Sequence, residues 1–174
     1  MITIREASET DAAALIELRK LLFKETEFLL LEPEEYSPTI DSETCFINAF
    51  NKSNNSSVFL AIDERENVIG FMGVAGGTTN RTSHKATIFM GILKKYWGKG
   101  VGKQFFKHFF IWAEDKRIVR YELTTAVNNT RAFSLYKSVG FDVECIKKKN
   151  IMVKDKPVDE YQMFYIVSES DTNV

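Results

Sequence analysis

The chain has 174 residues, a length that fits one domain, and its 44% hydrophobic content is ample for one core. Its net charge of −1 at pH 7 gives no general attraction to nucleic acid or to an anionic membrane. No apolar run approaches the roughly 18 residues of a membrane span, and the N-terminus lacks the build of a signal peptide, so we expect a cytoplasmic protein that binds neither nucleic acid nor membrane.

The first half of the chain predicts a strand, two helices and three more strands. Residues 2–6 alternate as a short strand, and Ser8 offers an N-cap for a helix over residues 11–23. Two prolines break the pattern, so we predict a loop over residues 26–39. The acidic residues at the start of this loop would suit the binding of a cationic amine, or they simply face solvent. The elements that follow are a helix over 41–51 and strands over 57–63, 67–77 and 84–93.

The second half predicts two helices that alternate with strands, followed by a terminal hairpin. A glycine-rich turn leads into a helix that runs through residue 116, and a second helix over 129–138 is ended by Gly140. The strands are expected over 119–127, 141–150 and 158–167, with a turn at 153–157 and a loose polar tail over 168–174. This order favours a single α/β domain over 1–174, with a mixed sheet and helices on both faces, over a doubly wound parallel sheet.

The stretch KKYWGKGVGKQFF, residues 94–106, places three glycines at alternate positions before an amphipathic helix. A helix N-terminus presents unpaired N–H groups that bind phosphate, and glycine lets a ligand approach the backbone closely. The spacing from Gly98 to Gly102 fits neither the nucleoside-triphosphate P-loop nor the dinucleotide fingerprint, and Gln104 stands where the P-loop needs a hydroxyl. A glycine turn without a ligand is the alternative.

A second motif, NNTRAFSLYKSVGF, lies downstream. On its own it is also compatible with an ordinary amphipathic helix. Together the two segments resemble the GNAT superfamily of N-acetyltransferases. YWGKGVGKQF is similar to the family's pyrophosphate-binding segment, although Trp97 stands where an Arg or Gln is usual. The second segment matches through Asn129, Ala132, Tyr136, Gly140 and Phe141. The resemblance implies a GNAT-type central sheet, mixed but mostly antiparallel.

The resemblance also implies that acetyl-CoA is the acetyl donor and that no metal takes part. Lys99 and Lys103 would add charge near the pyrophosphate or simply solubilise the turn, and Asn129 would bind the pantetheine arm or only cap its helix. Gly91, inside an apolar strand, is compatible with a bulge. The residues carried over for binding the donor are Ile92, Leu93, Lys94, Trp97, Gly98, Lys99, Gly100, Val101, Gly102, Lys103, Asn129 and Tyr136.

For the chemistry, the resemblance makes Tyr136 the general acid, with packing in the core as the alternative, and places an oxyanion-binding N–H near Gly91 or Ile92. Candidates for the base are Glu25, Glu27 and Glu122, each of which is otherwise a solvated surface charge; deprotonation through water is equally plausible. Cys45 and Cys145 match no metal or disulfide spacing, so we expect two reduced thiols in the core.

The resemblance therefore implies an N-acetyltransferase that acts on a primary amine by direct attack, and we expect a small-molecule amine or an amino acid as acceptor. A protein N-terminal or lysine acetyltransferase is the alternative enzyme. A CoA-binding module without turnover is a third possibility, but binding alone does not need the hydroxyl of Tyr136. We further expect a homodimer, because the last two strands alternate apolar and polar residues near an edge of the sheet that needs cover.

Overall fold

The computed structural model describes residues 1–167, and the predicted flexible tail, 168–174, lies outside them. The elements follow the predicted order. The strands are β1 (Thr3–Glu6), β2 (Ser57–Ile62), β3 (Val68–Gly76), β4 (Lys85–Ile92), β5 (Arg120–Ala126), β6 (Asp142–Val153) and β7 (Lys156–Ile166). The helices are α1 (Ala12–Glu25), α2 (Ile40–Asn51), α3 (Val101–Ala113) and α4 (Thr130–Ser138). Short 3-10 turns occupy Glu9–Asp11, Pro33–Glu35 and Lys94–Tyr96.

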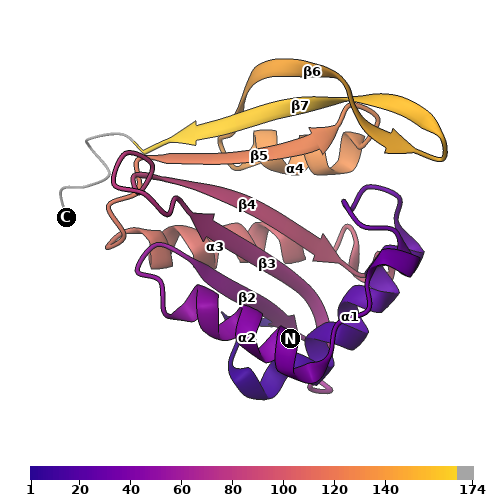
Figure 1. Ribbon diagram of the computed structural model, residues 1–174, viewed down its shortest axis with the longest axis vertical. Coiled ribbons are helices and arrows are strands. Elements are labelled where there is room, and N and C mark those ends of the chain that lie inside the picture. The colour runs from indigo at the N-terminus through magenta and orange to yellow at the C-terminus, as the bar shows by residue number, and fades with distance from the viewer. Residues whose placement is uncertain (168–174) are drawn as a thin grey trace.

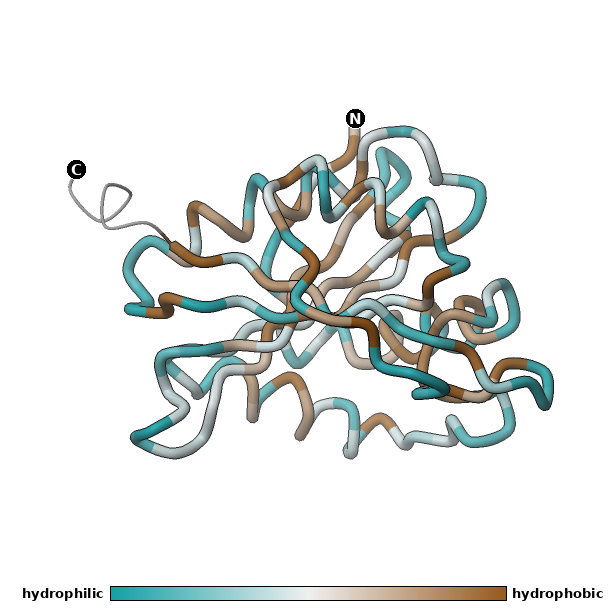
Figure 2. The backbone as a smooth tube through the Cα atoms, turned by 90° about the horizontal axis from the view of Figure 1, so that it is seen from above, coloured by the Kyte–Doolittle hydropathy of each residue, from teal (hydrophilic) through white to brown (hydrophobic). Residues whose placement is uncertain are grey.

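The seven strands form one mixed sheet in the order β1-β2-β3-β4-β5-β7-β6, with helices on both faces, as the sequence predicts. Helices α1 and α2 cover one face, and α3 and α4 cover the other (Figure 1). Each face has its own apolar core, led by Leu15, Leu18 and Leu22 under α1 and by Phe105 and Phe109 under α3. Brown and teal segments alternate along the outer helices in Figure 2, as expected of helices with one buried side.

The sheet opens between β4 and β5. These two strands form the one parallel pair within residues 1–167, and they pair only where Lys85–Thr87 lie beside Arg120–Glu122. Beyond these residues the strands diverge (Figure 1), while β4 continues along β3 and β5 continues along β7. The divergence leaves the last residues of β4 with a free edge in the middle of the sheet.

The terminal hairpin is longer and tighter than the sequence predicts. The predicted strands over 141–150 and 158–167 extend towards each other until only Lys154 and Asp155 separate them. Both of these residues have positive φ, 49° and 59°, as a two-residue type I′ turn requires.

Among residues 1–167, none of the helices has the length and apolar character that a membrane span needs.

Two local expectations are wrong. The predicted bulge at Gly91 is absent, since β3 and β4 stay in unbroken register from Gly70↔Ile92 to Gly76↔Ala86. A glycine is needed there for space, because a Cβ on residue 91 would lie 2.8 Å from Leu22 Cδ1. Neither cysteine is in the core: Cys45 and Cys145 are both free and exposed, because each sits on the outer side of its element.

Candidate active site

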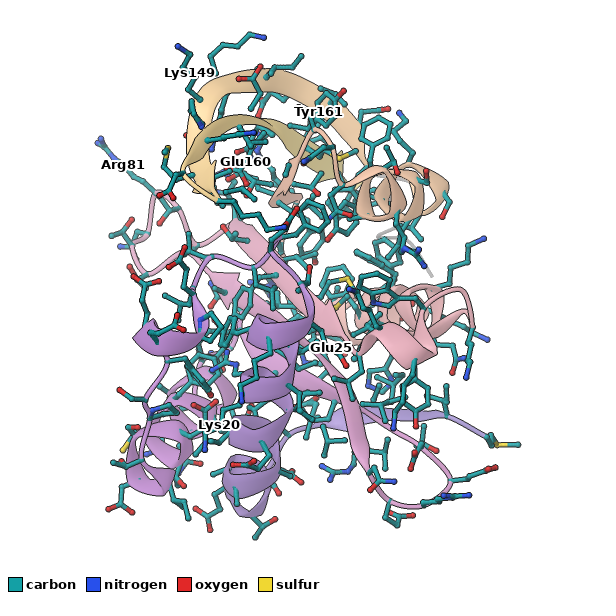
Figure 3. All side chains as sticks on the ribbon, turned by 90° about the vertical axis from the view of Figure 1, so that its right-hand side faces the viewer. Lys20, Glu25, Arg81, Lys149, Glu160 and Tyr161 are labelled. Atoms are coloured by element: carbon teal, nitrogen blue, oxygen red, sulfur yellow. The ribbon has the colours of Figure 1, made fainter. Side chains whose placement is uncertain are left out.

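A pocket of about 890 Å³ occupies the opening between β4 and β5. Its walls come from α1 and the loop after it, from β4, β5 and α4, and from the β6–β7 hairpin. Figure 3 views the molecule from the side on which the strands diverge, with the hairpin arching over the end of α1. The pocket therefore brings together segments from the whole length of the chain, including the two predicted motifs.

The glycine-rich turn before α3 is shaped for an anion. Gly98 and Gly100 have φ of +73° and +79°, and a Cβ at either position would meet nothing within 4 Å, so their backbone is open to a ligand. The first hydrogen bond of α3 runs from the N–H of Gln104 to the carbonyl of Gly100. The N–H groups of residues 101–103 precede that bond and have no acceptor among the described residues, an arrangement that suits a pyrophosphate.

The third glycine of the motif has a different task. Gly102 lies inside α3, and a Cβ there would come 2.5 Å from Leu135 Cδ2 on α4. It thus lets the two helices approach each other beside the turn.

Of the two lysines in YWGKGVGKQF, Lys99 places its ammonium group 5.1 Å from the centre of the Tyr96 ring. No ion pair is formed by Lys99 or Lys103 with any residue up to position 167.

The free edge of β4 offers backbone groups to a ligand. Leu93 N–H donates to Ile69 on β3, and hydrogen-bonded residues alternate along an antiparallel pair. The N–H and C=O groups of Met90 and Ile92 consequently point away from β3, into the gap. Gly91 points its N–H at β3, which leaves Ile92 as the better of the two predicted oxyanion donors.

Side chains already occupy part of this edge. The indole Nε1–H of Trp97 donates to the carbonyl of Ile92 at 2.6 Å, and the Arg131 guanidinium lies over the indole ring at 4.4 Å. The N–H of Lys94, predicted to bind pantetheine, donates to Oε2 of Glu25 at 2.7 Å. The aromatic residue at the position of the usual Arg or Gln therefore packs along the strand edge.

Helix α4 supplies Asn129 and Tyr136. Oδ1 of Asn129 accepts the N–H of Ala132 at 3.2 Å, so this residue caps the helix, while its amide NH₂ remains for a ligand. Tyr136 lines the pocket with 8% of its surface exposed and packs edge-to-face on Phe106. Burial raises the pKa of its phenol to about 12, so the side chain stays protonated at any physiological pH.

The three predicted bases lie outside the pocket lining. Glu25 faces Lys94 as described, and Glu27 forms an ion pair with Lys154 that ties the loop after α1 to the β6–β7 turn. Glu122 is paired with Arg120 and Lys85. Burial raises its pKa, but the Arg120 hydrogen bond and the nearby Lys85 charge more than offset this, so that the pKa falls below its ordinary value. This position argues against Glu122 as the base.

The pocket contains an acid that sequence reasoning missed. Glu160 on β7 is the one carboxylate in the lining formed by residues 1–167, and it is 9% exposed. Asn150 Nδ2 on β6 donates to its Oε2 at 2.5 Å. The alternating pattern of β7 is that of any half-exposed strand, so nothing local marked this glutamate. Within the described residues, no group of three or more His, Cys, Asp or Glu residues could hold a metal.

Arg19 on α1 also lines the pocket. Its guanidinium bonds Glu43 Oε1 at 2.8 Å and lies 4.7 and 4.8 Å from the ring centres of Phe46 and Phe71. This buried pair holds α1 against α2 beneath the loop that covers the pocket.

Comparisons with known proteins agree on one family. The model of the acetyltransferase (GNAT) family matches residues 16–141. An L-amino acid N-acetyltransferase, AaaT, from Escherichia coli is 28% identical over 97 residues, which are 55% of this chain and 60% of that protein. The match therefore spans less than two thirds of that relative's length.

Solved structures match almost the whole chain. A GNAT-family acetyltransferase from Streptococcus pneumoniae has 27% identity and a TM-score of 0.92, with 96% of this chain and 100% of that chain covered. A phosphinothricin acetyltransferase from Sinorhizobium meliloti, solved in complex with acetyl-CoA, has a TM-score of 0.82 over 97% of this chain and 89% of that one. Its 16% identity makes this second likeness one of fold.

Proposed function

Because this chain belongs to the GNAT family of acetyl-CoA-dependent N-acetyltransferases, we propose that it transfers the acetyl group of acetyl-CoA to a primary amine of a small molecule, amino acids included. The observation that carries the proposal is that one pocket joins the free edge of β4 to Tyr136 on α4 and is also lined by Trp97, the residue that precedes the glycine turn. A phosphate site, a strand edge and a proton donor are what acetyl transfer from a CoA thioester needs.

The residues of the chain fit the donor along its length. The amides of residues 98–103 would cradle the pyrophosphate, with Trp97, Lys99 and Lys103 at its border. The residues 92–94 would bind pantetheine through the strand edge, as an added strand does, together with the amide NH₂ of Asn129. Bound acetyl-CoA supplies the acetyl group as a thioester.

The remaining steps belong to side chains and backbone at the floor of the pocket. The N–H of Ile92 would stabilise the negative charge that develops on the acetyl oxygen when the amine attacks. Tyr136 would give its proton to the leaving sulfur, which its high pKa allows because the phenol is protonated beforehand.

The segments that flank the pocket favour a small acceptor over a protein. The loop after α1 covers one side, and the Glu27–Lys154 ion pair joins it to the hairpin on the other. The name of the Escherichia coli relative supports amino acids as acceptors. Protein N-termini or lysines remain the second candidate, and a CoA-binding module without turnover is the third.

The test is a thiol-release assay with acetyl-CoA and a panel of amines: free amino acids, simple alkyl and aryl amines, polyamines and short peptides. We expect turnover with members of the small-molecule set and little with peptides. Turnover with peptides alone would favour the second candidate. Binding of acetyl-CoA without turnover on any amine would favour the third.

We also propose a homodimer formed through β6, in keeping with the cytoplasm as the place where acetyl-CoA is used. This strand is an edge of the sheet, and Val143, Ile146 and Met152 on it are 38%, 44% and 60% exposed. An unpaired edge with apolar side chains is a surface that proteins usually cover.

A further inference from the structure

Glu160 is a buried carboxylate whose side-chain hydrogen bond comes from a neutral amide, while Lys147, opposite it on β6, forms no ion pair with it. Glu160 is 9% exposed, and no ion pair joins it to any residue in the described range 1–167. Its hydrogen bond from Asn150 satisfies part of its oxygen capacity, but an amide carries no positive charge. Burying an ionised carboxylate is costly unless a charge or several hydrogen bonds compensate it, so this site is incomplete as it stands.

The register of the sheet places this carboxylate on the acceptor side of the pocket. Glu160 lies opposite Ala126 on β5 and Lys147 on β6. Its neighbours Tyr161 and Met163 face the core under α3 and α4. Since side chains alternate along a strand, Glu160 faces the other side, towards α1 and the loop after it. Figure 3 shows it under the β6–β7 hairpin, above the end of α1.

A bulge in β6 brings Asn150 to this carboxylate. Pairing jumps from Lys147↔Glu160 to Ile151↔Val158, so that Lys148–Asn150 together face the single residue Asp159. Lys149 has φ of +53°, and Asp159 fixes the bulge by accepting its N–H at 2.8 Å. The Lys149 side chain projects outward from the hairpin (Figure 3), while Asn150 turns into the pocket lining. Bulges re-aim side chains in this way next to active sites.

We infer that Glu160, held by Asn150, binds the ammonium group of the acceptor and takes its proton, and that acceptors are primary ammonium ions with an apolar body. This inference rests on the proposed N-acetyltransferase function. One N–H proton passes to the Glu160 carboxylate, and the lone pair left on nitrogen forms the C–N bond to the acetyl carbon. The carbonyl re-forms, the C–S bond breaks, its electron pair leaves on sulfur, and Tyr136 protonates that sulfur. The nitrogen then gives up its second proton, which returns to the Tyr136 oxygen, so that the products are a neutral amide and the CoA thiol and the phenol is restored.

The rest of the lining suits an apolar body. Leu22, Phe28, Leu29, Phe89 and Ile151 line the same pocket, and they come from α1, its loop, β4 and β6. An amine could therefore place its ammonium group against the carboxylate and its apolar part against these side chains at the same time. The Glu160 carboxylate, the one negative charge in the lining formed by residues 1–167, then contacts the ammonium group, which must lose its charge before the nitrogen can attack.

The experiment compares wild type with Glu160→Gln, using 2-phenylethylamine as the probe at saturating acetyl-CoA. Glutamine keeps the volume but carries no charge and cannot take the proton. We expect kcat/KM to fall by about 10²–10⁴-fold, with unchanged acetyl-CoA affinity and melting temperature. The matched control is Glu122→Gln, which removes a carboxylate on the neighbouring strand outside the pocket and should stay within about twofold of wild type.

Asn150→Ala supplies the second variant, at an exposed position where truncation removes no side chain from the core. Because Asn150 positions Glu160 and does not exchange protons, its loss should raise KM for the amine about five- to tenfold and lower kcat less. Wild-type kinetics in Glu160→Gln would overturn the inference while leaving the proposed function intact.

A readout without turnover separates the two proposals. Calorimetry of 2-phenylethylamine binding to the CoA complex should show binding to wild type and to Glu122→Gln, and none to Glu160→Gln. If wild type acetylates no amine of the panel, the proposed function fails, and this titration alone decides the role of Glu160. Equal binding to wild type and Glu160→Gln would then overturn the inference as well.

Discussion

The carboxylate of Glu25, at the end of α1, accepts the backbone N–H of Lys94 at 2.7 Å. The bond closes the free edge of β4 at the point where a pantetheine arm is proposed to add. An N–H has one proton to donate, so Glu25 and the donor compete for it. The unliganded protein is thus expected to exchange one internal hydrogen bond for one to its substrate.

Glu25→Ala should therefore tighten CoA binding. Without the Glu25 carboxylate, the Lys94 N–H is free to donate to the pantetheine arm. A net hydrogen bond worth about 1 kcal/mol corresponds to roughly a fivefold lower Kd for CoA. Calorimetry with CoA measures it. Glu27→Ala is the control, because it removes a similar charge nearby but touches no group of the strand edge. Weaker binding in Glu25→Ala would mean that this carboxylate helps to hold the donor.

Gly100→Val should abolish acetyl-CoA binding. Valine disfavours the φ of +79° and places its branched side chain where the pyrophosphate must approach the backbone. The strained backbone costs about 1–2 kcal/mol of stability in addition. Gly140→Ala is the matched control, because it imposes comparable strain at φ +99° at the end of α4, away from the turn. Unchanged affinity in Gly100→Val, measured by calorimetry, contradicts the cradle.

Tyr136→Phe should lower kcat by about 10²–10⁴-fold and leave acetyl-CoA affinity nearly unchanged, because only the proton donor is lost. The ring keeps its contact with Phe106, so the melting temperature should not move. Tyr161→Phe, which removes a hydroxyl on β7 outside the pocket, should behave as wild type. Steady-state and thermal measurements on both variants decide this. Full turnover in Tyr136→Phe would assign the tyrosine to packing alone.

Asp11→Asn should destabilise the protein in a pH-dependent way. The hydrogen bond from Arg5, together with those from Ser8, outweighs burial and lowers the Asp11 pKa to about 2. Because the pKa of Asp11 is lower in the folded state than its unfolded value of 3.8, the ionised carboxylate stabilises the folded state at pH values above 3.8. This contribution is lost as the pH falls towards 2. We expect a loss of about 1–2 kcal/mol in unfolding free energy at pH 7, after allowance for solvent screening of the half-exposed Arg5.

Urea unfolding at pH 7 and at pH 2.5 tests the Asp11 prediction, and the gap between wild type and variant should shrink at the lower pH. Glu17→Gln is the control, since its pair with Lys20 is exposed and should change stability by less than about 1 kcal/mol at either pH. A gap that is the same at both pH values would show that the lost stability is not electrostatic.

Ile146→Lys should dissociate the proposed dimer. It places a charge in the middle of the exposed face of β6, where burial in an interface would be costly. Sedimentation should give a dimer for wild type and a monomer for the variant at micromolar concentration. Ile111→Lys, at an exposed position of α3, is the control and should remain dimeric. A monomeric wild type contradicts the proposal.

The sequence predicted those features whose cause is local. The glycine turn before α3 was visible because positive φ restricts Gly98 and Gly100 to one residue type, and the strand and helix order followed from periodicity. The mostly antiparallel pairing of the mixed sheet was expected only through the family resemblance.

What the sequence did not predict depends on contacts between distant residues. Glu160 becomes an active-site candidate only because the register of β6 and β7 and the covering loop bury it. Gly91 was assigned to a bulge because its true constraint, the close approach of Leu22 from α1, is invisible along the chain. The outward side of Cys45 and Cys145 likewise depends on how α2 and β6 are oriented in the fold.

The short pairing of β4 with β5 has a mechanical consequence. Within residues 1–167, strand pairing between the four-stranded part of the sheet, β1 to β4, and the three-stranded part, β5 to β7, is limited to three residue pairs. Bound acetyl-CoA, hydrogen-bonded to the edge of β4 and to α4 on the other side of the opening, would link the two parts of the sheet. Ligand binding to the native state raises the free energy of unfolding by RT ln(1 + [L]/Kd). Amide exchange at Met90 and Ile92 should consequently slow in the complex more than exchange within either part of the sheet.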